Sequence, residues 1–148
     1  MSSSPLAFTR DELKVYLIGI FPQVWASGLY EIEEIGPMSA RMRLNFHPDH
    51  LRPGGTISGP SLFALADLAL YVAILAQIGR VPLAVTTNLN INFLRKPAPG
   101  PILGEAKLIK LGKRLAVGEV ALRSGGETEM VAHATGTYSI PADAREVS

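Results

Sequence analysis

One apolar run dominates the sequence: SLFALADLALYVAILAQI, at residues 61–78. The run is too long for a strand and has about the length that spans a bilayer. Asp67 lies near its middle, where an aspartate would cost about 2.5 to 3.5 kcal/mol in a membrane. The residues downstream alternate between apolar and polar, as the strands of a soluble sheet do. We therefore expect a long helix in the core of a soluble protein.

The rest of the chain predicts one short leading helix and a series of strands. Thr9 and Glu12 have the spacing of a capping box, and apolar residues at helical spacing follow until Phe21 and Pro22 end the pattern. Residues 47–60 carry three prolines and three glycines, which break both helix and strand, so we expect a loop there. Alternating patterns bounded by turn residues predict six strands, at residues 29–35, 40–46, 86–96, 102–111, 115–123 and 129–140.

The predicted fold class is α+β, with an antiparallel six-stranded sheet wrapped around one long central helix and a short N-terminal helix beside it. Short turns join most of the strands, which favours antiparallel neighbours. The leading helix is too short to cover the apolar run, so the sheet must wrap it. A chain of 148 residues suffices for a single domain, with its core at about 27–140 and flexible ends at 1–8 and 142–148.

Composition excludes several classes of function. The net charge is +1, and no long run of one sign occurs, so we expect no nucleic-acid partner. Cysteine is absent, which excludes thiolate catalysis and cysteine-based zinc sites. The N-terminus shows no export signal, and we expect a cytoplasmic protein. Charged residues make up 18% of the chain, below the roughly 25% typical of soluble domains, so copies of the chain should bury surface against one another.

Asp67 is the candidate for chemistry, because only it and Arg80 are charged between residues 53 and 94. Burying a carboxylate costs several kcal/mol unless the group is paired or hydrogen-bonded. The residue therefore has either a structural hydrogen bond or a catalytic role. On a helical wheel it lies away from a stripe of alanines, on the same side as Phe63 and Tyr71, so it should flank the contact with the sheet.

The helix start upstream is a second candidate site. Ser58 fits the N-cap, and Pro60 fits the first turn, where proline is tolerated. Gly59 has no side chain, so a ligand oxygen can approach its N–H closely, and the helix dipole adds to the attraction. The alternative is a helix cap with no binding role.

Residues 52–67, RPGGTISGPSLFALAD, resemble the active-site segment of the hot-dog-fold thioesterases, in the phenylacetate-degradation (PaaI-like) branch. That branch has roughly Asn-x-x-Gly-x-x-His-Gly-Gly, then six residues, then Asp. Gly55, Gly59 and Asp67 match this pattern in register. Residues 86–100, TTNLNINFLRKPAPG, resemble the third strand of the family and its proline-ended exit.

The resemblance implies a homodimer or tetramer in which two subunits pair their sheets edge to edge, with active sites at the dimer interface. It implies hydrolysis of an acyl-CoA or similar acyl thioester, with coenzyme A as part of the substrate and no other cofactor. By similarity, the Gly59 N–H polarises the thioester carbonyl, Asp67 is general base or nucleophile, and Thr86 helps to hold the attacking water.

The resemblance and the positions of the polar residues give five candidate substrate-binding residues: Arg52, Ser58, Tyr71, Arg95 and Lys96. Arg52 and Ser58 stand where the family has Asn or Gln and His. Arg95 and Lys96, like the basic residues of the turn at 110–114, either bind phosphates of coenzyme A or are solvated turn residues. Because Arg52 and Ser58 depart from the family pattern, two alternatives stay open: a hot-dog domain that binds acyl-CoA without hydrolysing it, and a structural oligomer.

The positions of the three histidines do not indicate a metal site. His47 and His50 flank Asp49, but the surrounding loop offers no other clear ligand, so we expect no metal there. His133 lies within a predicted strand, and we interpret it as structural.

Overall fold

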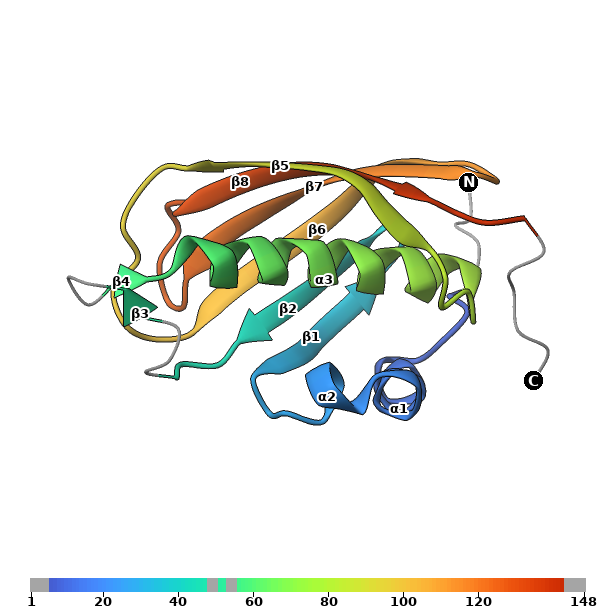
Figure 1. The fold of residues 1–148 in the computed structure, drawn as a ribbon, viewed down its shortest axis with the longest axis horizontal. Coiled ribbons are helices and arrows are strands. Elements are labelled where there is room, and N and C mark those ends of the chain that lie inside the picture. The colour runs from blue at the N-terminus through green and yellow to red at the C-terminus, as the bar shows by residue number, and fades with distance from the viewer. Residues whose placement is uncertain (1–5, 48–50, 53–55, 143–148) are drawn as a thin grey trace.

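The apolar run forms one long helix, α3 (Gly59–Ile78), which lies in the curve of an antiparallel sheet (Figure 1). The computed structural model describes residues 6–47, 51–52 and 56–142. The order of the sheet is β1-β2-β6-β7-β8-β5. Its strands are β1 (Tyr30–Gly36), β2 (Ser39–Leu44), β5 (Val85–Phe93), β6 (Ile102–Leu111), β7 (Leu115–Ser124) and β8 (Ala132–Ser139). The predicted six-stranded α+β fold is therefore confirmed.

Two short helices precede the sheet and lie beside β1 (Figure 1). Helix α1 (Arg10–Ile20) begins with the predicted capping box, in which the Glu12 N–H donates to Thr9 Oγ1 at 3.1 Å and the Thr9 N–H donates to Glu12 Oε1 at 2.8 Å. Phe21 ends α1, as predicted. A single helical turn, α2 (Pro22–Trp25), follows, and the sequence analysis did not predict it.

Two predicted boundaries need correction. The expected loop at 47–60 contains a small antiparallel hairpin, β3 (Leu51–Arg52) and β4 (Thr56–Ile57), whereas α3 begins at Gly59, as the predicted N-cap at Ser58 requires. Strand β5 ends at Phe93 rather than just before Pro97, because the next two N–H groups both donate to the carbonyl of Val131.

Residues 1–8 were expected to be flexible, but the last two of them contact the fold. Phe8 is 5% exposed and belongs to the core, and the Ala7 N–H donates to the Ala76 carbonyl at 2.8 Å. Residues 1–5 and 143–148 lie outside the described part of the chain.

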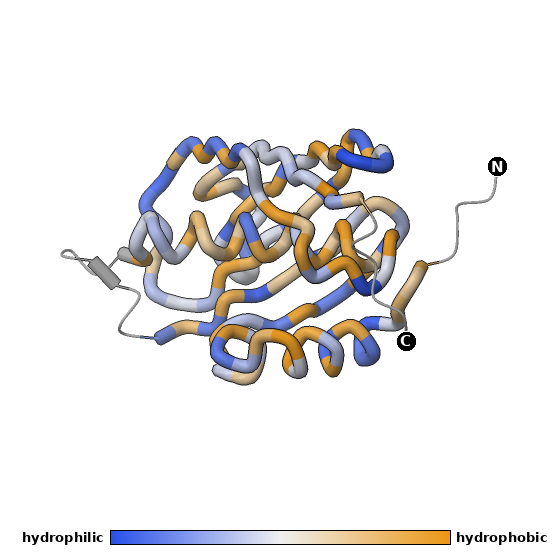
Figure 2. Tube along the Cα trace, turned by 45° about the vertical axis from the view of Figure 1, so that its right-hand side comes forward, coloured by the Kyte–Doolittle hydropathy of each residue, from blue (hydrophilic) through white to orange (hydrophobic). Residues whose placement is uncertain are grey.

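The core sits between α3 and the sheet. Four alanines form the predicted stripe on α3 and are fully buried: Ala66, Ala69, Ala73 and Ala76. Along the strands, hydrophobic and hydrophilic residues alternate (Figure 2), and in β8 alternate residues are buried. The helix is long and apolar enough to cross a membrane by length and composition alone, but 61% of that stretch is buried inside this fold. Helix α3 is therefore the buried core helix of this fold.

Close packing of α3 depends on glycines in the facing strands. A Cβ atom added at Gly118 would lie 2.7 Å from Leu70 Cδ2 and 3.0 Å from the carbonyl oxygen of Lys107. Leu70 is 1% exposed, and the Lys107 oxygen belongs to the backbone of β6, so neither atom can move freely. The sheet approaches the helix at this point because the residue has no side chain.

Replacing Gly118 with alanine should lower the free energy of unfolding by about 1 to 3 kcal/mol, because the methyl group overpacks the core. Denaturant unfolding monitored by circular dichroism measures the change. Gly19→Ala is the matched control: nothing lies within 4 Å of its added Cβ, and alanine favours the helix there. Equal stability of the two variants would contradict the packing argument.

Candidate functional site

The Asp67 carboxylate is tied to two strands through one of its oxygens. The Thr86 hydroxyl donates to Asp67 Oδ1 at 2.6 Å, and the Tyr138 hydroxyl donates to the same oxygen at 2.7 Å. Tyr138 also contacts the main-chain carbonyl of Asp67 at 3.0 Å. The acid therefore lies on the side of α3 that faces β5 and β8, off the alanine stripe. The structure brings the predicted pair Asp67 and Thr86 into contact.

Tyr138 is a part of this cluster that the sequence analysis missed. Its side chain is 3% exposed, and burial together with the negative charge of Asp67 raises the pKa of Tyr138 well above its usual range. The phenol therefore stays protonated and acts as a donor. The sequence did contain a signal for this contact. Tyr138 shares a strand face with Ala134 and Gly136, which places it in the core, and the hydroxyl group of a buried tyrosine usually has a hydrogen-bond partner.

The carboxylate opens onto a cavity of about 240 Å³. Asp67, Thr86 and Tyr138 contribute to its lining, and the rest comes from the α1–α2 segment, from α3 and from residues 82–85. Tyr71, a predicted substrate-binding residue, also lines it, and its hydroxyl donates to the Pro82 carbonyl at 3.0 Å. An acid beside an apolar cavity has the arrangement expected of a site for small-molecule chemistry.

The start of α3 leaves one N–H without an acceptor within the helix. Ser58 caps the helix by accepting the Ser61 N–H at 3.4 Å, and Pro60 has no N–H to donate. The Gly59 N–H remains, because the first N–H groups of a helix lack an intrahelical acceptor. Among the described residues it has no recorded acceptor. The Phe93 ring lies 3.3 Å from the place where a Cβ of residue 59 would be, so the ring packs closely against the side of Gly59 that carries no side chain.

Gly59 and Asp67 do not meet within one protomer. Eight residues of α3 separate them, which is about 12 Å along the helix axis. A group bound to the Gly59 N–H would therefore be remote from the carboxylate of the same chain. Strand β5, which contributes Thr86 to this site, is an edge strand of the sheet and carries the exposed apolar side chains of Val85 and Phe93.

The other predicted substrate-binding residues differ in what they contact in the structure. The Ser58 hydroxyl caps α3 and also lies 2.8 Å from the Ser61 hydroxyl, and its role in substrate binding stays a prediction. Arg95 forms an ion pair with Glu129, and Lys96 is exposed. The Arg52 side chain lies outside the part of the chain whose side chains are described.

The histidines give no metal site among the described residues. His133 Nε2 lies 3.1 Å from a Glu119 carboxylate oxygen, in keeping with a structural role. No group of three metal-ligating side chains occurs in the ranges 6–47, 51–52 and 56–142. His50 and Asp49 fall outside those ranges.

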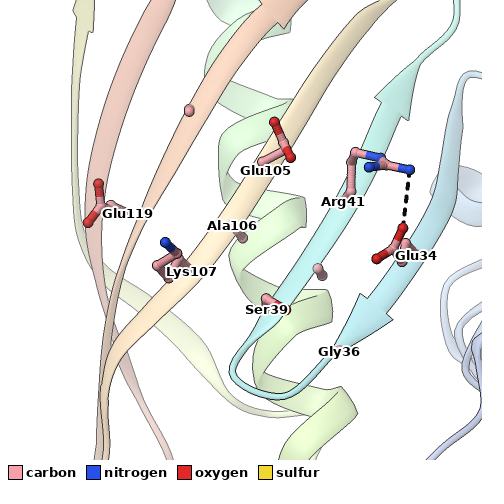
Figure 3. A pocket seen from close by; sticks show the side chains of 10 residues that line it. Glu34, Gly36, Ser39, Arg41, Glu105, Ala106, Lys107 and Glu119 are labelled. Carbon is pink, nitrogen blue, oxygen red and sulfur yellow. Dashed lines mark ion pairs between the residues drawn. The ribbon is translucent and has the colours of Figure 1, made fainter.

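A second hollow, of about 320 Å³, lies over β1, β2, β6 and β7. Figure 3 shows its charged side chains on the face of the sheet turned away from α3, whose ribbon lies behind the strands. Arg41 is held there by Glu34 at 3.2 Å, and Glu105 pairs with Arg123. These opposite charges pair with one another across the strands. Asp67, in contrast, accepts hydrogen bonds from two hydroxyl groups, and the residues that line its cavity, all within the described part of the chain, include no cation. The cavity beside Asp67 is therefore the better candidate site.

Comparisons with known proteins agree with this fold. A family model described as the thioesterase superfamily matches residues 54–131. A protein of Saccharolobus solfataricus provisionally named an esterase is 32% identical over 110 residues, which are 74% of this chain and 72% of that protein.

Solved structures give the same result. A protein from Silicibacter sp. TM1040, provisionally assigned as a thioesterase, has a TM-score of 0.84 and 50% identity, over 92% of this chain and 94% of that chain. The phenylacetic acid degradation protein PaaI from Thermus thermophilus, in a mutant form, has a TM-score of 0.69 and 29% identity, over 81% of this chain and 99% of that chain. The predicted resemblance to hot-dog thioesterases of the PaaI-like branch is confirmed by these matches.

Proposed function

Because the chain belongs to the thioesterase superfamily, we propose that it hydrolyses an acyl-CoA or similar acyl thioester at a site shared by two copies of the chain. The observation that carries the proposal is the arrangement of Asp67. Both donors bind Oδ1, whereas Oδ2 has no recorded donor among the described residues, and the carboxylate lines an apolar cavity. A carboxylate fixed in this way can take a proton from water beside a bound carbonyl.

The reaction uses water as the nucleophile. Asp67 Oδ2 accepts a proton while the water oxygen forms a bond to the thioester carbonyl carbon. The resulting oxyanion is stabilised by the Gly59 N–H of the second copy. When the C–S bond breaks, the proton goes to the departing sulfur, which leaves a carboxylic acid and a free thiol. Thr86 has two roles. Its hydroxyl group donates a hydrogen bond to Asp67, and the lone pairs of the same oxygen can accept a hydrogen bond from the attacking water.

Two copies complete this site by pairing at β5. The edge strand offers unpaired backbone groups, and the exposed Phe63 of α3 lies with Val85 and Phe93 among the apolar side chains left uncovered in one protomer. Coenzyme A then enters as part of the substrate, with Lys96 as an exposed cation for its phosphates. The proposed chemistry requires no other cofactor and no metal.

A panel of acyl-CoA thioesters with a thiol reagent tests the proposal. The chain has no cysteine, so the protein itself does not react with the reagent. We expect thiol release that saturates with substrate concentration. Saturable binding without thiol release would instead indicate an acyl-CoA-binding domain, and the absence of both would leave Asp67 as a structural acceptor.

Tyr138→Phe should lower kcat roughly tenfold and leave KM nearly unchanged, because a hydrogen bond to a charged group contributes about 1.5 to 3 kcal/mol. The phenol orients the carboxylate and is not needed to bind the acyl group. Steady-state kinetics and a melting curve of the same preparation measure the effect. Tyr30→Phe is the matched control, because Tyr30 lies on β1, far from β8 in the sheet order. A similar change in kcat for both variants would contradict a positioning role for Tyr138.

A further inference from the structure

The cavity beside Asp67 has one polar end and one apolar end. Asp67, Thr86 and Tyr138 form the polar end through their hydrogen bonds. Of the eleven residues that line the cavity, all within the described part of the chain, Asp67 alone is charged. A charged acyl group would therefore lie among apolar side chains without a counter-charge, which costs several kcal/mol for a group taken from water. The cavity suits an uncharged, apolar acyl group.

The α1–α2 segment forms one apolar wall of the cavity. Phe21 ends α1, because Pro22 cannot continue the helix, and the chain turns there into α2. Ile20, Phe21 and Trp25 all line the cavity as a result. Trp25 is 5% exposed and belongs to the core, whereas Phe21 is 47% exposed. Trp25 is therefore the buried part of this wall, and Phe21 is the part exposed at the surface.

The volume limits what fits. A cavity of about 150 Å³ lined by aliphatic and aromatic side chains holds one benzene ring, or about 25 Å³ for each heavy atom. At that packing, the 240 Å³ beside Asp67 holds about ten heavy atoms. An aromatic ring with a short linker fits, and so does a chain of about eight carbons. A chain of about sixteen carbons exceeds the volume that one protomer provides, so we expect it to meet the wall formed by Phe21 and Trp25 before it is fully enclosed.

We propose that Phe21 and Trp25 set the upper size of the acyl group, so that short apolar acyl groups are accepted and long chains are refused. This inference rests on the proposed function, since it assigns a substrate class to the same site. The selectivity comes from a segment that precedes the sheet in the chain and lies outside the residues that carry the chemistry.

The test measures kcat/KM for straight-chain acyl-CoA substrates from about four to about sixteen carbons, together with an arylacetyl-CoA. In the unaltered protein we expect kcat/KM to fall at least about tenfold between the octanoyl and palmitoyl substrates. Trp25→Ala should move the decline to longer chains. Phe21→Ala is a second variant with a smaller effect on folding, because that side chain is half exposed. Phe46→Ala is the matched control, since Phe46 is 44% exposed and does not line the cavity.

Binding of the same panel to Asp67→Asn, measured by calorimetry, separates this inference from the proposed function. Binding with a length limit but no turnover in the unaltered protein overturns the hydrolase and supports the size limit. Turnover without a length limit overturns only the size limit, as does an unchanged limit in both Phe21→Ala and Trp25→Ala. If nothing binds and nothing is hydrolysed, both proposals are overturned.

Discussion

Asp67→Asn should lower thioester turnover by at least tenfold and leave the fold intact. A positioned general base contributes about 10² to 10⁴ in rate, and asparagine cannot take the proton from water. The amide does preserve the structural contacts, because its carbonyl oxygen can accept from Thr86 and Tyr138 in place of Oδ1. The substitution therefore separates the chemical role of the residue from its structural role. Thiol release under saturating substrate measures kcat, and a melting curve monitors the fold.

Asp11→Asn is the control for this prediction, since it removes one carboxylate from a side chain that is 81% exposed and remote from the cavity. Its turnover should equal that of the unaltered protein. If Asp67→Asn matched the control in turnover, Asp67 would be no more than a buried acceptor for two hydroxyl groups. A rise in stability of Asp67→Asn with unchanged turnover would point the same way, because replacing a half-buried charge removes a desolvation cost.

The helices and strands were predictable from sequence where their signals are local. The capping box of Thr9 and Glu12 and the cap at Ser58 are visible within four residues, and both appear in the structure. Alternation predicted the strands because one face of each packs on α3. The single turn α2 and the hairpin of β3 and β4 were not predictable, because elements of two to four residues have no periodic pattern of their own.

The site was only partly predictable for a related reason. Asp67 and Thr86 are 19 residues apart and join the middle of α3 to the start of β5. Tyr138 is 71 residues from Asp67, and its contact depends on β8 lying beside β5 in the sheet. Periodicity gives the faces of a strand but not the order of strands, so this contact was not accessible without the fold.

The departures from the family pattern also become interpretable. At position 58 the family has His, whereas here the Ser58 hydroxyl accepts the Ser61 N–H at the helix start. Pro60, in place of the second glycine, removes a donor that would compete at the same helix end. The proposed chemistry therefore depends on a carboxylate and a backbone amide, and the side chain at position 58 is not needed for either.

Gly59→Pro should lower kcat by about 10² to 10³, because it removes the proposed oxyanion donor and nothing else in the helix needs that N–H. Proline is favoured at the first helical position, and Ser58 already has the extended backbone, with φ −71° and ψ 150°, that a following proline requires. Gly59→Ala is the matched control. It adds a Cβ against the same Phe93 ring but keeps the N–H, so kcat should fall far less.

Mixing the two inactive variants then tests whether the site is shared. If Asp67 of one copy works with Gly59 of the other, a mixed dimer of Asp67→Asn and Gly59→Pro contains one intact site and one doubly defective site. Random assortment makes half of the dimers mixed, so activity should recover to about a quarter of that of the unaltered protein. A site contained within one protomer predicts no recovery at any mixing ratio. The separation of about 12 Å along α3 makes recovery the expected result.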